Sequence, residues 1–306
     1  MADAPRYDFD AIDLDSGNVH ADVVNFVEPG SRVLELGPAT GYMSRAFVEQ
    51  RGCNVVGIEF DSGMAERAAA ICERVIVGDL DHLDLEAELG EDRFDAIVSA
   101  DVIEHLKDPL GALRRLRPFL KENGRFAISI PNVAHSSIRL ALLSGRFEYR
   151  DWGLLDSTHL RFFTRETFER TLDDAGLDLV ELRPHELPAA AAEIEFDEAA
   201  LPEGLPQALE AEPDARAYQF VALAVPKGGG ESATRPEAAA GNTAPTLRQA
   251  TDAHREQRVQ EETEALRGEI TTLRAENERL SARLDRILAT PPARAYAALR
   301  RLGKRS

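Results

Sequence analysis

Residues 33–41 read V-L-E-L-G-P-A-T-G, and residues 55–61 read V-V-G-I-E-F-D. The first stretch is an apolar strand that leads into a glycine loop, and the second is another strand that ends on Glu59. A loop of small residues lets the backbone approach a ligand closely. An acid at the end of the neighbouring strand lies where ribose hydroxyls bind. The two stretches therefore predict a site for an adenosine-containing cofactor at the carboxyl edge of a parallel sheet.

Composition narrows the class of protein. The 306 residues are 43% hydrophobic, which is enough for one full-sized domain plus further segments. A net charge of -18 argues against nucleic acid as the main partner, because phosphates need clustered cations. The two cysteines, Cys53 and Cys72, are too few for a disulfide framework and indicate a reducing compartment. With no signal peptide and no membrane-length apolar run, we expect a cytoplasmic protein.

The chain divides into four parts by composition. Residues 1–226 alternate apolar strand-like runs with amphipathic helical stretches, the pattern of an α/β domain. Residues 227–250 are rich in Gly, Ala, Pro and Ser and are predicted to be a flexible linker. Residues 251–290 are charged with a helical period, and residues 291–306 are a basic tail.

The α/β part is predicted to be a seven-stranded, mostly parallel Rossmann-like sheet with helices on both faces. We expect strands at 32–37, 54–60, 74–78, 94–100, 124–130, 177–183 and 217–225. We expect the helices between them to include 40–51, 62–72, 108–121 and 165–175. An Ala-, Glu- and Pro-rich insertion at 186–216 receives no predicted role.

Two cofactor classes compete for the glycine loop. A dinucleotide site requires G-x-G-x-x-G, a spacing that residues 37–41 lack. The sequence instead resembles the E-x-G-x-G-x-G pattern of class I S-adenosylmethionine-dependent methyltransferases, with Ala39 in place of the middle glycine. The resemblance covers residues 20–225 and implies S-adenosylmethionine as the cofactor. The alternative interpretation is that the acids at the strand ends are ordinary surface charges.

The resemblance implies roles for individual residues. Glu59 matches the ribose-binding acid, and Asp79, in V-I-V-G-D-L, matches the acid that pairs with the adenine amino group. The run F-D-A-I-V-S-A-D-V-I-E-H-L at 94–106 resembles the fourth strand and the loop after it. The cofactor-binding candidates are Glu35, Gly37, Ala39, Gly41, Glu59, Phe60, Asp79, Leu80, Ala100 and Asp101.

Two histidines are candidates for the reacting centre. Methyl transfer requires alignment of a nucleophile with the donor and exclusion of water. A hydroxyl acceptor must also lose its proton, for which histidine is suited near neutral pH, whereas an amine only has to arrive uncharged. His105 follows the fourth strand, and His159 lies in G-L-L-D-S-T-H-L-R-F-F-T. The alternative for each is structural: ordering of a loop for His105, and a hydrogen bond within its turn for His159.

The acceptor side is predicted from resemblance alone. Residues 131–135, 142–149 and 153–164 resemble a subgroup of methyltransferases found among glycan-assembly and natural-product enzymes. The substrate-binding candidates that this implies are Asn132, Asp156, Thr158 and Arg161. No metal is predicted, because the histidines and cysteines show no ligand spacing.

The C-terminal part carries a heptad pattern. Val259, Leu266, Leu273, Leu280 and Ile287 recur every seven residues, with Thr263, Ile270, Asn277 and Leu284 at the companion positions. This pattern predicts a parallel coiled coil and a homodimer through residues 259–288. The alternative is a single amphipathic helix that packs on its own domain. The basic tail is predicted to be solvated; the alternative is contact with an anionic membrane surface, at the inner face of a membrane, or with a partner protein.

The sequence therefore predicts a dimeric methyltransferase that moves a methyl group to an acceptor hydroxyl or amine, with a sugar or glycan-linked substrate favoured. One alternative is a small natural-product or amino-acid-derived acceptor. Another is a coiled-coil scaffold whose cofactor-binding domain is not catalytic.

Overall fold

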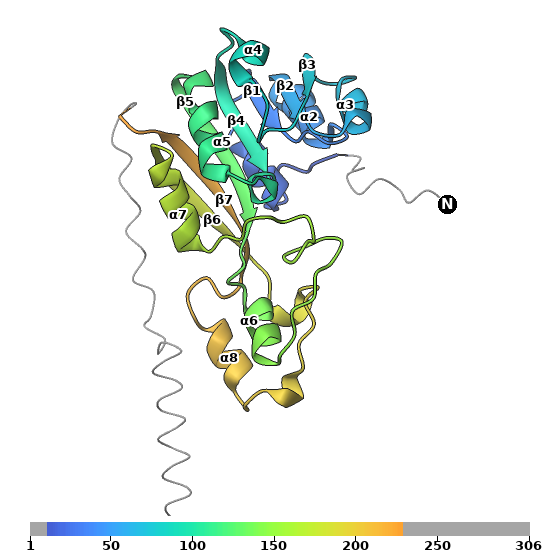
Figure 1. The fold of residues 1–306 in the computed structure, drawn as a ribbon, viewed down its shortest axis with the longest axis vertical. Helices are drawn as coiled ribbons and strands as arrows, with labels where there is room; N and C mark the ends of the chain where they lie inside the picture. The colour runs from blue at the N-terminus through green and yellow to red at the C-terminus, as the bar shows by residue number, and fades with distance from the viewer. Residues whose placement is uncertain (1–10, 229–306) are drawn as a thin grey trace, which may run out of the picture. The chain divides into compact units, whose positions relative to one another are not determined.

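The structure of the protein is a computed structural model that describes residues 11–228 (Figure 1). The predicted coiled coil, the basic tail and all but the start of the predicted linker lie outside the described residues.

The described residues form one seven-stranded sheet in the order β3-β2-β1-β4-β5-β7-β6. The strands are β1 (Arg32–Leu36), β2 (Asn54–Glu59), β3 (Arg74–Val77), β4 (Phe94–Ala100), β5 (Leu120–Pro131), β6 (Leu177–Glu186) and β7 (Ala217–Pro226). Strands β1 to β5 pair in parallel, and β7 pairs antiparallel with both β5 and β6. The predicted mostly parallel sheet is confirmed. Because the order reverses between β1 and β4, their carboxyl ends flank a crevice of the kind that binds ligands.

Helices cover both faces of the sheet (Figure 1). They are α1 (Val19–Asn25), α2 (Tyr42–Arg45), α3 (Ser62–Ala68), α4 (Leu85–Leu89), α5 (Pro109–Leu116), α6 (Ser136–Leu143), α7 (Arg165–Asp174) and α8 (Leu205–Glu210). Short helical turns are the π-helix η1 (Ala46–Gln50) and the 3-10 turns η2 (Ile103–His105), η3 (Arg117–Phe119), η4 (Ala189–Ala191) and η5 (Glu198–Ala200).

The alternation of side chains along β1 explains the two layers. Leu34 and Leu36 pack into a core with residues of α4, α5 and α7. Val33 points to the opposite face, into a second core with residues of α1, α2, η1 and α3. Successive residues of a strand face opposite sides, so a continuous apolar run is buried on both faces.

The helix predicted at 108–121 is shorter in the structure. Helix α5 ends at Leu116, the 3-10 turn η3 follows, and β5 already begins at Leu120. Pro118 has no backbone N–H to donate to the preceding turn, so the α-helical hydrogen bonds stop and the chain continues as the 3-10 turn. The helix predicted at 40–51 likewise begins at Tyr42 and continues as the π-helix η1.

The insertion at 186–216 covers the segment that the sequence assigned to the acceptor side. Helix α8 contacts α6, and the two lie together beyond the end of the sheet (Figure 1). A small apolar cluster joins this layer to the loop before His159: Ile138, Ala141, Leu154, Leu155 and Ile194. The insertion therefore forms one wall of the region that follows β5.

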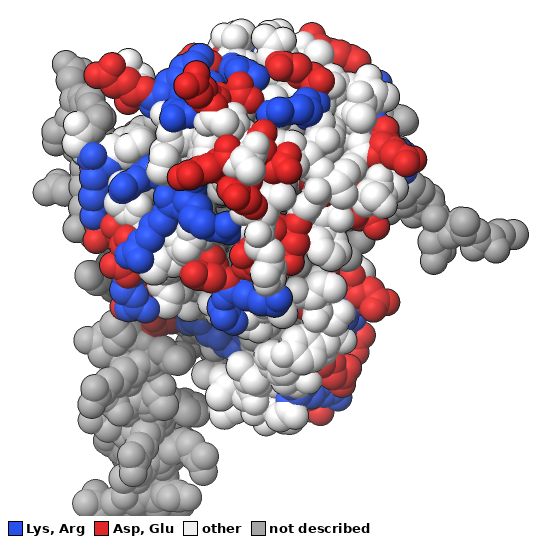
Figure 2. Space-filling view, turned by 45° about the horizontal axis from the view of Figure 1, so that its top comes forward, with Lys and Arg blue, Asp and Glu red and all other residues white. Residues whose placement is uncertain are grey.

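The surface mixes both signs of charge. On the face drawn in Figure 2, basic side chains are interspersed with acidic ones. Across the described residues, oppositely charged side chains form ion pairs, as in Arg32 with Asp92 at 2.8 Å and Lys121 with Asp95 at 2.7 Å. Within residues 11–228, no helix is long and apolar enough to cross a bilayer.

Candidate active site

The loop after β1 is held in a conformation that favours glycine. Gly37, Ala39 and Gly41 all have positive φ angles, of 63°, 50° and 84°. A Cβ added at Gly37 would lie 2.9 Å from the side chain of Val102, and one at Gly41 would lie 3.1 Å from the Cα atom of Ala68. The loop therefore packs tightly on its neighbours, which leaves no space for a side chain at Gly37 or Gly41.

Ala39 occupies the left-handed region without being glycine, at a cost of about 1–2 kcal/mol. Its N–H donates to Oε2 of Glu59 at 2.9 Å, and Oε1 of the same carboxylate accepts from the N–H of Asp61, also at 2.9 Å. Glu59 thus ties the loop after β1 to the turn after β2. Each of its oxygens keeps acceptor capacity for a ribose hydroxyl.

Glu35 is placed below the loop, not at the surface of the crevice. Its carboxylate is buried and accepts a hydrogen bond from the hydroxyl of Ser44 in α2. Burial raises the pKa of Glu35 to about 7; the Ser44 hydrogen bond opposes this shift and the charge of Glu59 adds to it. Glu35 therefore fixes α2 against β1, and Ser44 is a partner that the sequence pattern did not indicate.

Asp79 lies at the carboxyl end of β3, one strand beyond Glu59. Its Oδ1 accepts from the N–H of Asp81 and its Oδ2 is 2.9 Å from Nδ1 of His82. The backbone hydrogen bond from Asp81 is the main cause that lowers the pKa of Asp79, so the side chain is an anionic acceptor. Phe60, 75% exposed directly after Glu59, offers an apolar face beside it, whereas Leu80 is buried.

These side chains and the loop after β1 fit an adenosine-containing cofactor. Glu59 supplies acceptors for ribose hydroxyls, Asp79 supplies an acceptor for an amino group, and the loop at 37–41 lies beside Glu59, to which the N–H of Ala39 donates. Phe60 adds a surface for a flat ring.

At the end of β4, Asp101 also has a positive φ, of 54°. Its carboxylate accepts from the hydroxyl of Ser129 and from the side-chain amide of Gln219, both at 2.8 Å. These partners, on β5 and β7, hold Asp101 at the crevice immediately after Ala100. Sequence spacing found Asp101 but not the two residues that orient it.

His105 follows in the turn η2, and its tautomer is set by its surroundings. Its Nδ1 lies 3.2 Å from the carbonyl oxygen of Thr158 and 3.1 Å from the hydroxyl of Thr158. A carbonyl can only accept, so Nδ1 carries the proton and Nε2 keeps a lone pair. The hydroxyl of Thr158 in turn donates to Oδ1 of Asp156 at 2.7 Å.

His159 lies against His105 although 54 positions separate them in the chain. The ring centroids are 4.8 Å apart with an interplanar angle of 67°. Nδ1 of His159 is buried and has no hydrogen-bond partner among the described residues. Burial, followed by the nearby His105, lowers the pKa of His159, which keeps its imidazole neutral.

Glu104 completes this group, and the sequence analysis did not select it. The residue is fully buried, and neither side-chain oxygen bonds to another residue of the described chain. Burial raises the pKa of Glu104 well above its usual range, and the charges of Asp101 and Asp156 add to the shift. The only available signal was its position before His105 in the run 94–106, which did not distinguish it from a core-facing helix residue.

Two predicted acceptor residues have structural roles. Asn132 is fully buried, its side-chain amide donates to the carbonyls of Asp214 and Ala217, and its oxygen accepts from the N–H of Ala134. All its strong polar contacts are therefore internal. The guanidinium of Arg161 donates to the carbonyl oxygens of Lys107 and Leu160, which pins the 150–164 loop to the turn after β4. Asp156 and Thr158, by contrast, lie beside His105.

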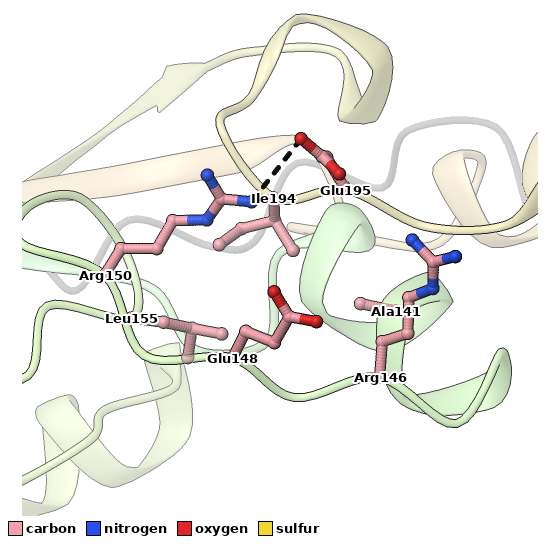
Figure 3. Close-up of a pocket in the computed structure, with 7 residues that line it drawn as sticks. All are labelled: Ala141, Arg146, Glu148, Arg150, Leu155, Ile194 and Glu195. Carbon is pink, nitrogen blue, oxygen red and sulfur yellow. Dashed lines mark ion pairs between the residues drawn. The ribbon is translucent and has the colours of Figure 1, made fainter.

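A small pocket with apolar and charged lining residues lies in the layer beyond the sheet. Figure 3 shows Glu148 between Arg150 and Arg146, with Ile194 and Leu155 nearby. Arg150 pairs with Glu195 at 3.9 Å, and Ala141 completes the lining. The pocket adjoins the segment that carries Asp156, because Leu155 lines it.

Comparison with known families gives a match over the region just described. A family model described as a methyltransferase domain matches residues 18–182, more than half of the chain. The chain belongs to this methyltransferase family. The loop after β1 and the acceptor side chains at the ends of β2 and β3 agree with S-adenosylmethionine as the methyl donor.

Relatives of the methyltransferase include ubiquinone biosynthesis O-methyltransferases. It is 28% identical over 156 residues to the one from Dinoroseobacter shibae and 32% identical over 157 residues to the one from Ruegeria pomeroyi. Each match covers 50% of this chain and 62% of the relative, so the chain spans about three-fifths of the length of these relatives.

Solved structures with a similar fold include CcbJ methyltransferase from Streptomyces caelestis, with 18% identity, a TM-score of 0.46, and coverage of 68% of this chain and 89% of that one. Another is a putative methyltransferase in complex with the Trm112 activator from Haloferax volcanii, with 19% identity, a TM-score of 0.47, and coverage of 67% and 88%.

Proposed function

We propose that the methyltransferase transfers its methyl group to an acceptor hydroxyl beside His105 and His159. The observation that carries this proposal is the pair of imidazoles near the carboxyl end of β4: His105 is held through its Nδ1, and Nδ1 of His159 has no partner among the described residues. A hydroxyl must lose its proton as the methyl group arrives, and a neutral imidazole is the common acceptor of that proton.

The residues of this chain have separate tasks in the reaction. Glu59 binds the ribose, Asp79 binds the adenine amino group, and the loop at 37–41 lies against the methionine part. The sulfonium of S-adenosylmethionine supplies an activated methyl group, whose bond to sulfur breaks with both electrons left on sulfur.

In the simplest route for the acceptor, its proton passes to Nε2 of His105 or to His159, and its oxygen forms the bond to the methyl carbon. Asp156 and Thr158 support this route by holding His105 in the tautomer with a basic Nε2.

For the acceptor we propose a sugar or glycan-linked hydroxyl. The segment that leads to Asp156 carries Arg146, Glu148 and Arg150 (Figure 3), whose charged ends can bond to a ligand with several hydroxyl groups. Tyr149 and Trp152 are 59% and 56% exposed in the same loop and offer flat faces for the apolar side of a sugar ring.

A second candidate is an aromatic or hydrophobic hydroxyl compound, which includes small natural products. Two observations favour it: the two named relatives are ubiquinone biosynthesis O-methyltransferases, and the loop also exposes the apolar side chains of Phe147, Leu160 and Phe162. This second candidate includes amino-acid-derived acceptors, because they would react at the same pair of histidines.

The first test is calorimetry of the full chain with S-adenosylmethionine and S-adenosylhomocysteine. Binding of both is expected, whereas a scaffold with a defunct pocket would release no heat. Transfer of labelled methyl groups to a panel of glycosides, phenols and amines then distinguishes the acceptor classes. Transfer to amines alone would overturn the hydroxyl proposal.

The second test is replacement of the two histidines. His105→Ala and His159→Ala should each slow transfer by at least about tenfold, because a positioned proton acceptor contributes about 10²–10⁴-fold. His185→Ala is the matched control, since His185 pairs with Asp22 outside this site. Unchanged rates in both site variants would refute the histidine proposal.

We further propose that residues 251–290 form a parallel coiled coil that makes the enzyme a dimer. We also propose, as the sequence predicts, that residues 291–306 are a basic tail and that the protein is cytoplasmic. Sedimentation of the full chain tests the oligomer, with a dimer expected. A monomer at micromolar concentration would contradict it.

A further inference from the structure

Three side chains near the end of β4 bring potential metal ligands together. A carboxylate oxygen of Glu104 and ring nitrogens of His105 and His159 all lie within 4.8 Å of one another. We propose that these three side chains bind a divalent transition-metal ion, and that this ion activates the acceptor hydroxyl. The proposal deepens the proposed function, because it rests on the same reacting centre.

The ligand atoms and their geometry suit such an ion. Three atoms at this separation have a common centre that lies about 2.8 Å or less from each of them. If each atom moves toward this centre by less than about 1 Å, its distance to an ion there reaches the usual 2.0–2.2 Å. Two imidazoles with one carboxylate form a ligand set that favours zinc, iron, cobalt or manganese over calcium or magnesium, which prefer oxygen ligands. Three protein ligands leave a position for the acceptor oxygen.

A second, independent observation is that two of these ligand groups have no hydrogen-bond partner among the described residues. Glu104 is fully buried, yet neither of its oxygens bonds to another described residue, and Nδ1 of His159 is equally unpartnered. A buried polar group without a partner costs about 1–3 kcal/mol, and more when it is charged. Such groups persist where a ligand satisfies them.

The surrounding charges also favour a cation. Among the described residues, the charged groups that act on the Glu104 carboxyl are two further carboxylates, Asp101 and Asp156. Asp156 reaches the cluster through Thr158 and His105, which is the outer hydrogen-bonding arrangement that orients metal-bound histidines. His105 and His159 are only half-buried, so an ion can enter from the acceptor side.

The ion changes how the proton leaves. With both imidazole lone pairs engaged, the acceptor oxygen binds at the open position, where the ion lowers the pKa of its hydroxyl and the proton passes to solvent water. The oxygen then forms its bond to the methyl carbon as the carbon–sulfur bond breaks.

The decisive experiment measures metal binding without an acceptor. The full chain is stripped with a chelator and titrated with Zn²⁺, Mn²⁺ and Mg²⁺ in a calorimeter, and bound metal is counted by elemental analysis. We expect one Zn²⁺ or Mn²⁺ per chain, weaker binding of Mg²⁺, and a rise in melting temperature with the bound ion.

Variants locate the ion. Glu104→Gln keeps the volume and removes the charge, and it should weaken metal binding at least tenfold, as should His159→Ala. His185→Ala should bind as the wild type does. Each variant is first shown to bind S-adenosylhomocysteine, so that a misfolded protein is recognised. Equal metal binding by the wild type and Glu104→Gln would overturn the proposal.

Activity separates this inference from the function on which it rests. Full methyl transfer by chelator-stripped, metal-free protein refutes the ion and leaves the histidine route in place. Metal binding with no transfer to any hydroxyl acceptor establishes the ion site and refutes the proposed function. Transfer that is lost on stripping and restored by Zn²⁺ or Mn²⁺ supports both.

Discussion

The cofactor edge and the acceptor side of this methyltransferase differ in how they treat their carboxylates. At the cofactor edge, Glu59 and Asp79 each accept backbone N–H groups. On the acceptor side, Glu104 is more deeply buried and lacks any partner among the described residues. The first arrangement builds a rigid binding surface before the ligand arrives. The second leaves polar capacity unfilled, which is the property of a site that completes itself with a ligand.

The largest expected effect concerns Glu35, the buried acid below the cofactor loop. Its folded pKa of about 7 exceeds the usual 4.5, so the native state binds the proton more tightly than the unfolded chain. The contribution of Glu35 to stability is therefore fully present below pH 4.5 and is lost as the pH rises through 7. The loss amounts to about 3 kcal/mol over this window.

Glu35→Gln removes that titration and can still accept from Ser44. Chemical unfolding is measured from pH 4.5 to 8. Over this range the free energy of unfolding of the variant should rise relative to that of the wild type by about 3 kcal/mol, and the rise should be complete above pH 7. Glu49→Gln, on an exposed ion pair with Arg45, should stay within about 0.5 kcal/mol throughout. Parallel curves for the wild type and Glu35→Gln would mean that the carboxyl is not held neutral.

Next in size is the effect of Glu59→Ala on cofactor binding. The change removes the proposed ribose acceptor and releases the N–H of Ala39, so the affinity for S-adenosylmethionine should fall about 30-fold, or about 2 kcal/mol. Calorimetry measures this affinity, and Glu66→Ala, at an exposed position of the following helix α3, is the control. An affinity within about threefold of the wild type would remove Glu59 from the cofactor site.

Thr158→Val tests the acceptor side more gently. The substitution keeps the shape but breaks the hydroxyl link between Asp156 and His105, while the carbonyl of Thr158 still holds Nδ1. We expect kcat to fall about fivefold with an unchanged affinity for S-adenosylmethionine, because Thr158 positions His105 and contacts no cofactor. Thr171→Val on α7 is the control. A change in cofactor affinity without a change in kcat would contradict this role.

The smallest effect concerns the left-handed Ala39. Glycine relieves the strain of a positive φ but adds freedom to the unfolded chain, so Ala39→Gly should stabilise the protein by up to about 1 kcal/mol. Ala65→Gly, inside helix α3, should instead destabilise it by about 1 kcal/mol. Thermal unfolding of both variants measures whether each change raises or lowers the stability. A destabilised Ala39→Gly would show that the loop conformation carries no strain.

The parts predicted well from sequence are those encoded by short, continuous patterns. Strand, glycine loop and terminal acid follow one another between residues 33 and 59, and the structure has β1, the loop and β2 there, with Glu59 at the strand end. Helix ends were less accurate, as at α5, where Pro118 ends the helix earlier than its apolar periodicity indicated. The heptad pattern lies outside the described residues and stays a prediction.

The sequence alone determined the fold and its cofactor edge, because alternating burial along strands and the glycine loop after β1 are local properties of the chain. Only the tertiary structure decided the composition of the acceptor side. It placed Glu104 and His105 against His159, and it enclosed Asn132 among the carbonyls of residues 214 and 217. Contacts between residues more than fifty positions apart depend on how a long loop packs back onto β4, and no local spacing carries that information.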